Sequence, residues 1–218
     1  MITRKELRQQ ALDTLSGKWT MPVLATLIYI AITAVPRILT NLGKPPYLFE
    51  PVTNAILITT GFILLIFLLP LEYGFGVSFL RFCKGNTLTV KEMFDASFGD
   101  YAKAFVRAFV TSFFVFLWTL LLIVPGFIKA LAYSMTFFIS DEHPEWTTLQ
   151  CIDESERMMK GHKWELFLLI LSFIGWFLLA LLSLGIGFLW LRPYIHVTKA
   201  KFYEQLKLEN CAETICFS

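Results

Sequence analysis

Residues 147–164 read TTLQCIDESERMMKGHKW and lead into the apolar run ELFLLILSFIGWFLLALL, residues 165–182. The segment opens with the helix-start box Thr147-x-x-Gln150, in which the Thr hydroxyl accepts from the third helical N–H while the amide reaches back. A glycine, Gly161, then precedes the apolar run. This order predicts a short capped helix, a glycine turn and a helix long enough to cross a membrane.

The same order of features occurs three times in the chain, which indicates an internal repeat. The other two helix-start boxes are Thr3-x-x-Glu6 and Thr89-x-x-Glu92. Each box is followed by a glycine, an aromatic residue and a long apolar hairpin whose second arm carries a tyrosine. These residues are Gly17, Trp19 and Tyr73 in the first unit, Gly99, Tyr101 and Tyr133 in the second, and Gly161, Trp164 and Tyr194 in the third.

The composition predicts a membrane protein. The chain is 56% hydrophobic and only 17% charged, which is more apolar surface than a soluble domain of 218 residues buries. We expect an all-α, polytopic membrane helix bundle with about six spans in three hairpin repeats, each preceded by an amphipathic interfacial helix. The expected spans are residues 20–39, 55–80, 104–124, 127–140, 165–183 and 186–207.

The expected organisation is a single integral membrane domain, residues 1–218, with repeat units at about 3–80, 89–140 and 147–207. Glycine is expected to end each interfacial helix in a left-handed conformation. The first hairpin has a long proline-containing loop at 41–51, whereas the second turns at Pro125-Gly126.

Basic residues predict the orientation. With six spans, one side of the membrane carries nearly all of them, and the positive-inside rule places that side, with both termini, in the cytoplasm. The expected location is therefore the inner (plasma) membrane of the cell. Nucleic-acid binding is not expected, because these groups alternate with acids and flank spans. The basic side holds Arg4, Lys5, Arg8, Lys18, Arg81, Lys84, Lys91, Lys103, Arg157, Lys160, Lys163, Lys199, Lys201 and Lys207, and the other side holds Arg37 and Lys44.

Several blocks of sequence carry a family resemblance. They are Ile123–Met135 with its Pro-Gly pair, Ser155–Lys163 with Met-Lys-Gly-His, Leu171–Trp176, Pro193-Tyr194 and Phe202-Tyr203. Together they resemble the bacterial integral membrane family catalogued as domain of unknown function 975, over nearly the whole chain. A more distant similarity is to the membrane domain attached to some glycerophosphodiester phosphodiesterases. The resemblance implies a six-span fold and no established activity.

Charged residues inside spans are the first candidates for a functional site, because each is costly in hydrocarbon. One hypothesis is a polar intramembrane cavity between the hairpins, suited to an anionic headgroup or a proton-coupled solute. The alternative is a buried Glu72–Arg192 pair that fixes helix register, with Lys129 extending toward the outer surface. The candidate residues are Glu72, Tyr73, Lys129, Tyr133, Arg192, Tyr194 and His196.

A second candidate site is the basic cluster formed by Arg157, Lys160, His162 and Lys163. It is expected either to contact anionic lipid or simply to anchor the chain at the cytoplasmic face. No glycine-rich phosphate-binding loop accompanies it.

No motif indicates catalysis. The chain has neither G-x-S-x-G nor H-E-x-x-H, and two of its three histidines fall in expected loops. We therefore expect no catalytic residues, no metal site and no cofactor. The favoured function is a non-catalytic membrane component that binds lipid, a membrane-protein partner or a second copy of itself. The alternatives are a small transporter or permease subunit with its site near Glu72 and Arg192, and a membrane enzyme acting on lipid headgroups.

Overall fold

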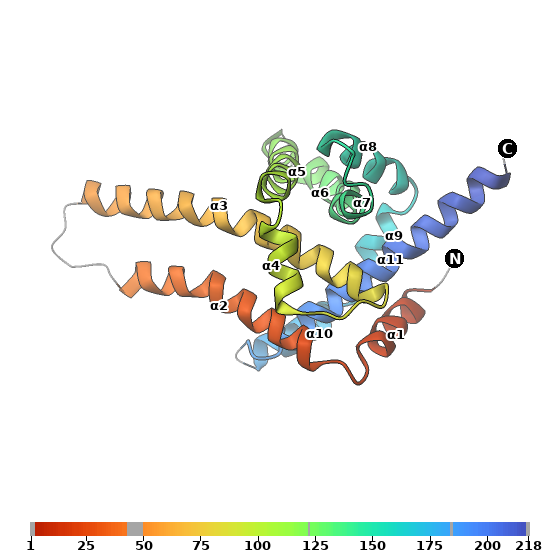
Figure 1. Cartoon of the computed structure of the whole chain (residues 1–218), viewed down its shortest axis with the longest axis horizontal. Coiled ribbons are helices and arrows are strands. Elements are labelled where there is room, and N and C mark those ends of the chain that lie inside the picture. Colours follow the sequence, from red (N-terminus) through yellow and green to blue (C-terminus); the bar gives the residue numbers. More distant parts are fainter. Residues whose placement is uncertain (1–2, 43–49, 122, 184, 217–218) are drawn as a thin grey trace.

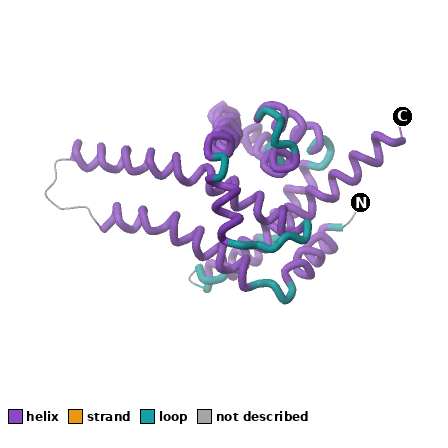
Figure 2. The backbone as a smooth tube through the Cα atoms, in the orientation of Figure 1, coloured by secondary structure: helices purple, strands orange, loops and turns teal. Residues whose placement is uncertain are grey.

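The structure, a computed structural model, describes residues 3–42, 50–121, 123–183 and 185–216, and the secondary structure in these ranges is helical (Figures 1 and 2). The helices are α1 (Arg4–Leu15), α2 (Thr20–Leu42), α3 (Glu50–Cys83), α4 (Val90–Phe98), α5 (Tyr101–Leu121), α6 (Ile123–Ala132), α7 (Thr136–Glu142), α8 (Thr148–Met158), α9 (Lys163–Leu171), α10 (Ile174–Leu182) and α11 (Phe188–Cys216).

The three short helices predicted from the helix-start boxes are all present. Thr3 and Thr147 cap α1 and α8, and each accepts a hydrogen bond from the backbone N–H three residues on. At α4, the Glu92 carboxylate accepts from the Thr89 backbone N–H at 3.2 Å. Each box therefore satisfies N–H groups that a helix start leaves without a partner.

Two of the three glycine turns have the expected conformation. Gly17 and Gly161 have positive φ values of 73° and 83°. The expectation for Gly99 is wrong, because its φ of −61° and ψ of −42° are right-handed. Its N–H bonds to the Asp95 carbonyl at 2.7 Å, so the backbone continues in helical geometry toward α5.

Each short helix packs on another helix. α4 crosses α3, α8 packs on α7, and α1 packs on α11. Each short helix also carries a buried small residue eight positions after its capping Thr. These residues are Ala11, Ser97 and Ser155, and all three are fully buried.

Within the described residues, three helical segments are long and apolar enough to cross a membrane: Ile66–Cys83, Tyr101–Leu120 and Lys163–Leu182. A fourth is possible if α1 and α2, bent by 96° at their junction, form one broken span. About 61% of the Ile66–Cys83 segment is buried, against 22% of each of the other two. α3 is thus the central helix, while α5 and α9–α10 present apolar surfaces outward.

The expected span at 127–140 is not continuous. α6 ends at Ala132 and α7 begins at Thr136, and the buried Ser155 hydroxyl bridges the break. It donates to the Ala132 carbonyl at 2.7 Å and accepts from the Met135 N–H at 3.3 Å. Ser155 thus satisfies backbone groups that the helix break would leave unpaired.

The second hairpin was expected to turn at Pro125-Gly126. The pair lies instead within the start of α6. A Cβ on Gly126 would come within 2.5 Å of the Thr119 Cα of α5. Glycine is therefore what allows the two helices to approach so closely.

The expected span at 186–207 corresponds to the first two thirds of α11, which is not among the candidate spans. Five charged residues interrupt its apolar character: Arg192, Lys199, Lys201, Glu204 and Lys207. α11 instead links the two largest hydrophobic clusters, to which it contributes Tyr194 and Val197 on one side and Tyr203 and Leu206 on the other. Of the loop expected at 41–51, residues 43–49 lie outside the described residues.

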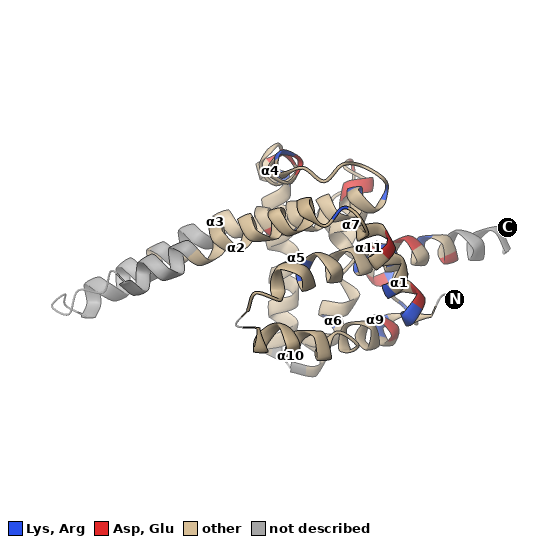
Figure 3. Cartoon of the chain, turned by 90° about the horizontal axis from the view of Figure 1, so that it is seen from below, with Lys and Arg blue, Asp and Glu red and all other residues tan. Residues whose placement is uncertain are grey.

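Charge separates along the molecule. Acidic and basic residues gather around α1, α7 and residues 199–210 of α11, and others lie on α4, whereas α10 has none (Figure 3). The start of α1 and the end of α11 lie at the same side of the molecule (Figure 1).

The α3–α4 crossing gives a test of this packing. A Cβ on Gly74 would lie 2.0 Å from the Ser97 Oγ and 2.7 Å from the Ser97 backbone N, whereas a Cβ on Gly76 meets only Phe137 at 4.0 Å. We predict that Gly74→Ala destabilises the protein by about 1–3 kcal/mol, as overpacking does. Gly76→Ala, the matched control, should be neutral or stabilising, since alanine favours helix by up to about 1 kcal/mol. Thermal unfolding in detergent measures both, and equal stability of the two variants would contradict the crossing.

Candidate functional site

The structure distributes the seven candidate intramembrane residues over separate places. Glu72 and Tyr73 are neighbours in the chain, but successive residues point about 100° apart around a helix. Glu72 faces α2 and α11, and Tyr73 faces α5 and α7.

Glu72 and Arg192 form an ion pair with Tyr29 of α2. The carboxylate lies 3.6 Å from the Arg192 Nη2 and accepts a hydrogen bond from the Tyr29 hydroxyl. The guanidinium lies over the Tyr29 ring, 4.1 Å from its centre. The side chains of Glu72 and Arg192 are 43% and 32% exposed in the chain. The expected pairing is therefore present, but the rest of the chain does not bury the pair. Its role as a polar intramembrane site stays a prediction.

Lys129 lies apart from this pair. Its Nζ contacts both carboxylate oxygens of Glu156 on α8, at 2.6 and 2.8 Å, and lies over the rings of Trp118 and Tyr133. The expectation that Lys129 extends to the outer surface is wrong, since α8 packs close enough to provide a carboxylate. The buried Tyr133 belongs to this group.

The remaining two candidates are mainly packing residues. The Tyr194 hydroxyl donates to the Arg8 carbonyl at 3.4 Å, and its ring packs edge-on against Phe173. His196 lies against the rings of Phe75 and Phe79, with centroid distances of 4.9 and 5.6 Å. Neither shares a cavity with Tyr73 among those found in the described part of the chain.

Tyr73 leads to a residue that the sequence interpretation missed. Arg107 of α5 donates to the Tyr73 hydroxyl at 3.2 Å and to the Pro144 carbonyl at 3.1 Å. Tyr73 also meets the Ser140 hydroxyl at 3.3 Å. Arg107 falls inside the predicted 104–124 span, so the rule used for Glu72, a charge inside a span, would have selected it.

Arg107 lines a cavity of about 310 Å³ between α3, α4, α5 and α7. Two ion pairs border the cavity, Arg81 with Asp141 at 2.5 Å and Lys103 with Asp100 at 2.9 Å.

The basic cluster occupies a corner between α8 and α9. Arg157 pairs with Glu154 at 2.6 Å, and the His162 Nδ1 lies 3.3 Å from a Glu165 carboxylate oxygen. Lys160 is exposed, and neither Lys160 nor Lys163 pairs with a carboxylate of the described residues. Next to Lys163, Trp164 is 65% exposed. The corner therefore presents two unpaired ammonium groups beside an indole ring, at the start of the candidate span Lys163–Leu182.

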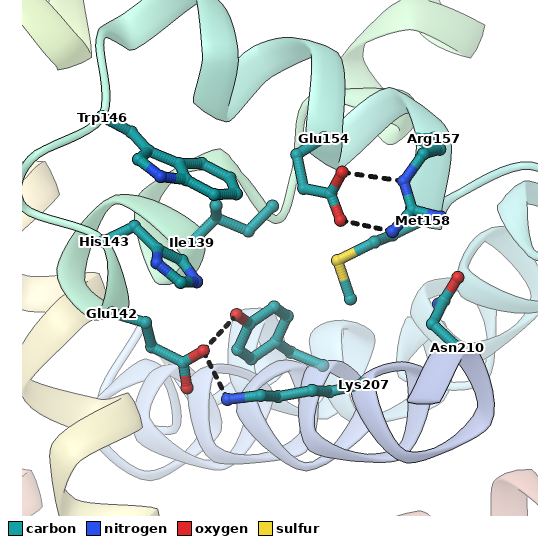
Figure 4. Close-up of a pocket in the computed structure, with 10 residues that line it drawn as sticks. Ile139, Glu142, His143, Trp146, Glu154, Arg157, Met158, Lys207 and Asn210 are labelled. Carbon is teal, nitrogen blue, oxygen red and sulfur yellow. Dashed lines mark hydrogen bonds and ion pairs between the residues drawn. The ribbon is translucent and has the colours of Figure 1, made fainter. Parts of the chain in front are cut away.

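A second polar pocket, of about 180 Å³, lies between α7, α8 and α11 (Figure 4). Glu142 faces Lys207 on one wall, the Glu154–Arg157 pair stands on another, and the rings of Trp146 and His143 stack at 4.2 Å. In the described residues, no group of three or more His, Cys, Asp or Glu side chains is placed to hold a metal ion.

Glu142 is the centre of a charged network. Its carboxylate accepts from Lys84 at 2.5 Å, Lys207 at 2.7 Å and Tyr203 at 2.9 Å. Burial by itself raises the pKa of the Glu142 carboxyl, but these hydrogen bonds outweigh burial and lower the pKa to about 2. The network ties the ends of α3 and α7 to α11.

Comparison with known proteins gives a partial family match. The model of the family described as protein of unknown function (DUF975) matches residues 120–210. This range contains every block that carried the resemblance, but it is narrower than the nearly whole-chain match expected. No curated protein and no solved structure matches, so nothing among them supports the similarity to the phosphodiesterase membrane domain.

The Glu142 network predicts a pH dependence. Because folding lowers the pKa of Glu142, its stabilisation is fully present above its ordinary pKa of 4.5 and is lost as the pH falls toward 2. Glu142→Gln should destabilise the protein at neutral pH by about 1.5–3 kcal/mol, the value of hydrogen bonds to a charged group. The difference between the melting temperatures of the two proteins should shrink as the pH falls from about 5 toward 2.

The control for this prediction is Asp153→Asn, which changes an exposed carboxylate of α8 outside the ion pairs of the described residues. It should leave the pH dependence unchanged. A Glu142→Gln protein whose deficit in melting temperature stays constant down to about pH 3 would contradict the network's role.

Proposed function

We propose that this protein is a non-catalytic membrane component that binds anionic lipid at the corner between α8 and α9. The observation that carries the proposal is the pair of cations without carboxylate partners in the described structure, Lys160 and Lys163, at the start of an apolar candidate span. Lysines at this position meet the phosphate level of a bilayer, where each basic group contributes about 1 kcal/mol of attraction to anionic lipid.

The surroundings of the corner support this reading. Trp164 is an aromatic residue of the kind enriched at membrane interfaces. Beyond it, α10 exposes apolar side chains on several sides, including Trp176, Phe177, Leu178, Leu179, Leu181 and Leu182. A surface that is apolar all round suits hydrocarbon rather than water.

The test is the anionic lipid that co-purifies in mild detergent. Lys160→Ala with Lys163→Ala should reduce bound phosphatidylglycerol several-fold, because about 2 kcal/mol of attraction is removed. The control, Lys160→Arg with Lys163→Arg, keeps both charges and should retain the lipid. Equal lipid content in the alanine variant and the unaltered protein would reject this site.

We also propose that the chain is a multi-pass protein of the inner membrane, built from three interfacial-helix-plus-hairpin units, with both termini in the cytoplasm. Support comes from the ion pairs that join the ends of α3, α7 and α11, the segments expected on one side. The matching buried small residues of α1, α4 and α8 support the repeated unit.

Reporter fusions at the two ends test this orientation. Both reporters should be active in the cytosol, because the positive-inside bias applies to the loops that share their side. Reporters found on opposite faces of the membrane would contradict the proposal.

A further inference from the structure

We propose that the cavity around Arg107 is a binding site for a phosphate group. The site is separate from the lipid-contacting corner at Lys160 and Lys163, and it shares no residue with that corner. It stands on a buried cation, a cavity beside that cation, and the position of both near one end of a candidate span.

Arg107 carries a positive charge in the interior of the protein. The residue is only 6% exposed, and no carboxylate of the described residues lies within ion-pair distance of it. A guanidinium in the interior is costly unless an anion or a full set of hydrogen bonds compensates it. The protein supplies two acceptors, the Tyr73 hydroxyl and the Pro144 carbonyl. A guanidinium has five N–H donors, so these acceptors leave most of its fork for another ligand.

The carboxylates around the cavity are either paired with other cations or exposed to solvent. Asp141 and Asp100 are already neutralised, by Arg81 and Lys103. Asp95 lies at the rim of the cavity, is exposed to solvent and makes no ion pair with a described residue. Asp100 and Glu145 are exposed and act on Arg107 only from beyond ion-pair distance, so among the described residues Arg107 is a buried charge without a directly paired carboxylate.

The cavity has both the hydrogen-bond donors and the volume to hold a phosphate group. The planar fork of arginine pairs with phosphate through two parallel hydrogen bonds. The hydroxyls of Tyr73 and Ser140 stand beside it. One of their two O–H groups is used in the hydrogen bond between them, so the other can donate to a phosphate oxygen. A cavity of about 310 Å³ has room for a phosphate group and several waters.

The cavity lies near the start of α5, one end of a candidate span. Arg107 is the seventh residue of α5, so it lies about 9 Å along the helix from Tyr101. The rim residues, Asp95, Gly99 and Asp100, belong to the corner where α4 leads into α5. A lipid headgroup could enter at this level from the bilayer, and free phosphate could enter from water. Both present the same oxyanion to Arg107.

The experiment measures thermal stabilisation of the full chain in a maltoside detergent that lacks phosphate. Three additions are compared: inorganic phosphate, phosphatidylglycerol, and diacylglycerol as the lipid without phosphate. A ligand that occupies the site at many times its dissociation constant should raise the melting temperature of the unaltered protein by about 3 °C or more. A rise with inorganic phosphate assigns a site open to free phosphate, and a rise with phosphatidylglycerol alone assigns a lipid headgroup.

Arg107→Met should abolish this rise while retaining the fold, since an apolar side chain of similar length replaces an uncompensated charge. Arg107→Lys keeps the charge without the fork and should retain only part of the rise, and it serves if the Met variant does not fold. Lys201→Met, a control on α11 remote from the cavity, should keep the full rise, as should the Lys160→Ala, Lys163→Ala variant.

Absence of any rise with inorganic phosphate and phosphatidylglycerol would overturn the proposal. A rise that persists in full in Arg107→Met and Arg107→Lys would overturn it as well. Stabilisation by diacylglycerol equal to that by phosphatidylglycerol would overturn it too, because it would show that the acyl chains alone bind.

Discussion

The structure depends on the close approach of three short helices to the helices beside them. α1, α4 and α8 pack on α11, α3 and α7, and each has a fully buried small residue: Ala11, Ser97 and Ser155. At α4 the approach leaves no space for a Cβ on Gly74, and at α8 the Ser155 hydroxyl takes over backbone hydrogen bonds where α6 gives way to α7. Small residues let backbones approach closely, which is how helices associate where hydrocarbon offers no hydrophobic driving force. Packing of this kind explains how a helix can break within an apolar environment without unpaired backbone groups.

Polar interactions divide into two kinds in this fold. At one end, the network of Glu142 with Lys84, Lys207 and Tyr203 fixes the ends of three helices through paired charges. Arg107, in contrast, is buried and held by two neutral acceptors, with no carboxylate of the described residues within ion-pair distance. Paired charges contribute to the architecture, whereas a charge left without a counterion marks a place where a ligand would contribute. This contrast is why the cavity beside Arg107, rather than the more obvious ion pairs, carries the binding hypothesis.

The contacts of the candidate site residues could be predicted only in part from the sequence. Glu72 and Arg192, which were selected from the sequence, form an ion pair. The pairing could be predicted because few charged residues lie beside prolines in the apolar runs. The sequence did not separate Glu72 from Tyr73, although the helix turns the two side chains to different neighbours. Lys129 was expected to extend toward the outer surface, and only the packing of α8 beside α5 brings Glu156 to it. Arg107 was detectable in principle, as a charge inside a predicted span.

The sequence by itself determined the helical class, the three capped helix starts, two of the three left-handed glycines and the apolar segments, because each follows from local hydrogen bonding or from the length of an apolar run. Tertiary structure decided which segments continue and which break. α6 and α7 separate because a serine from α8 satisfies the break, and α11 differs from a lipid-facing span because it lies between two hydrophobic clusters and carries charges that meet partners there. Such outcomes depend on residues far apart in the chain, and a local pattern contains no information about those partners.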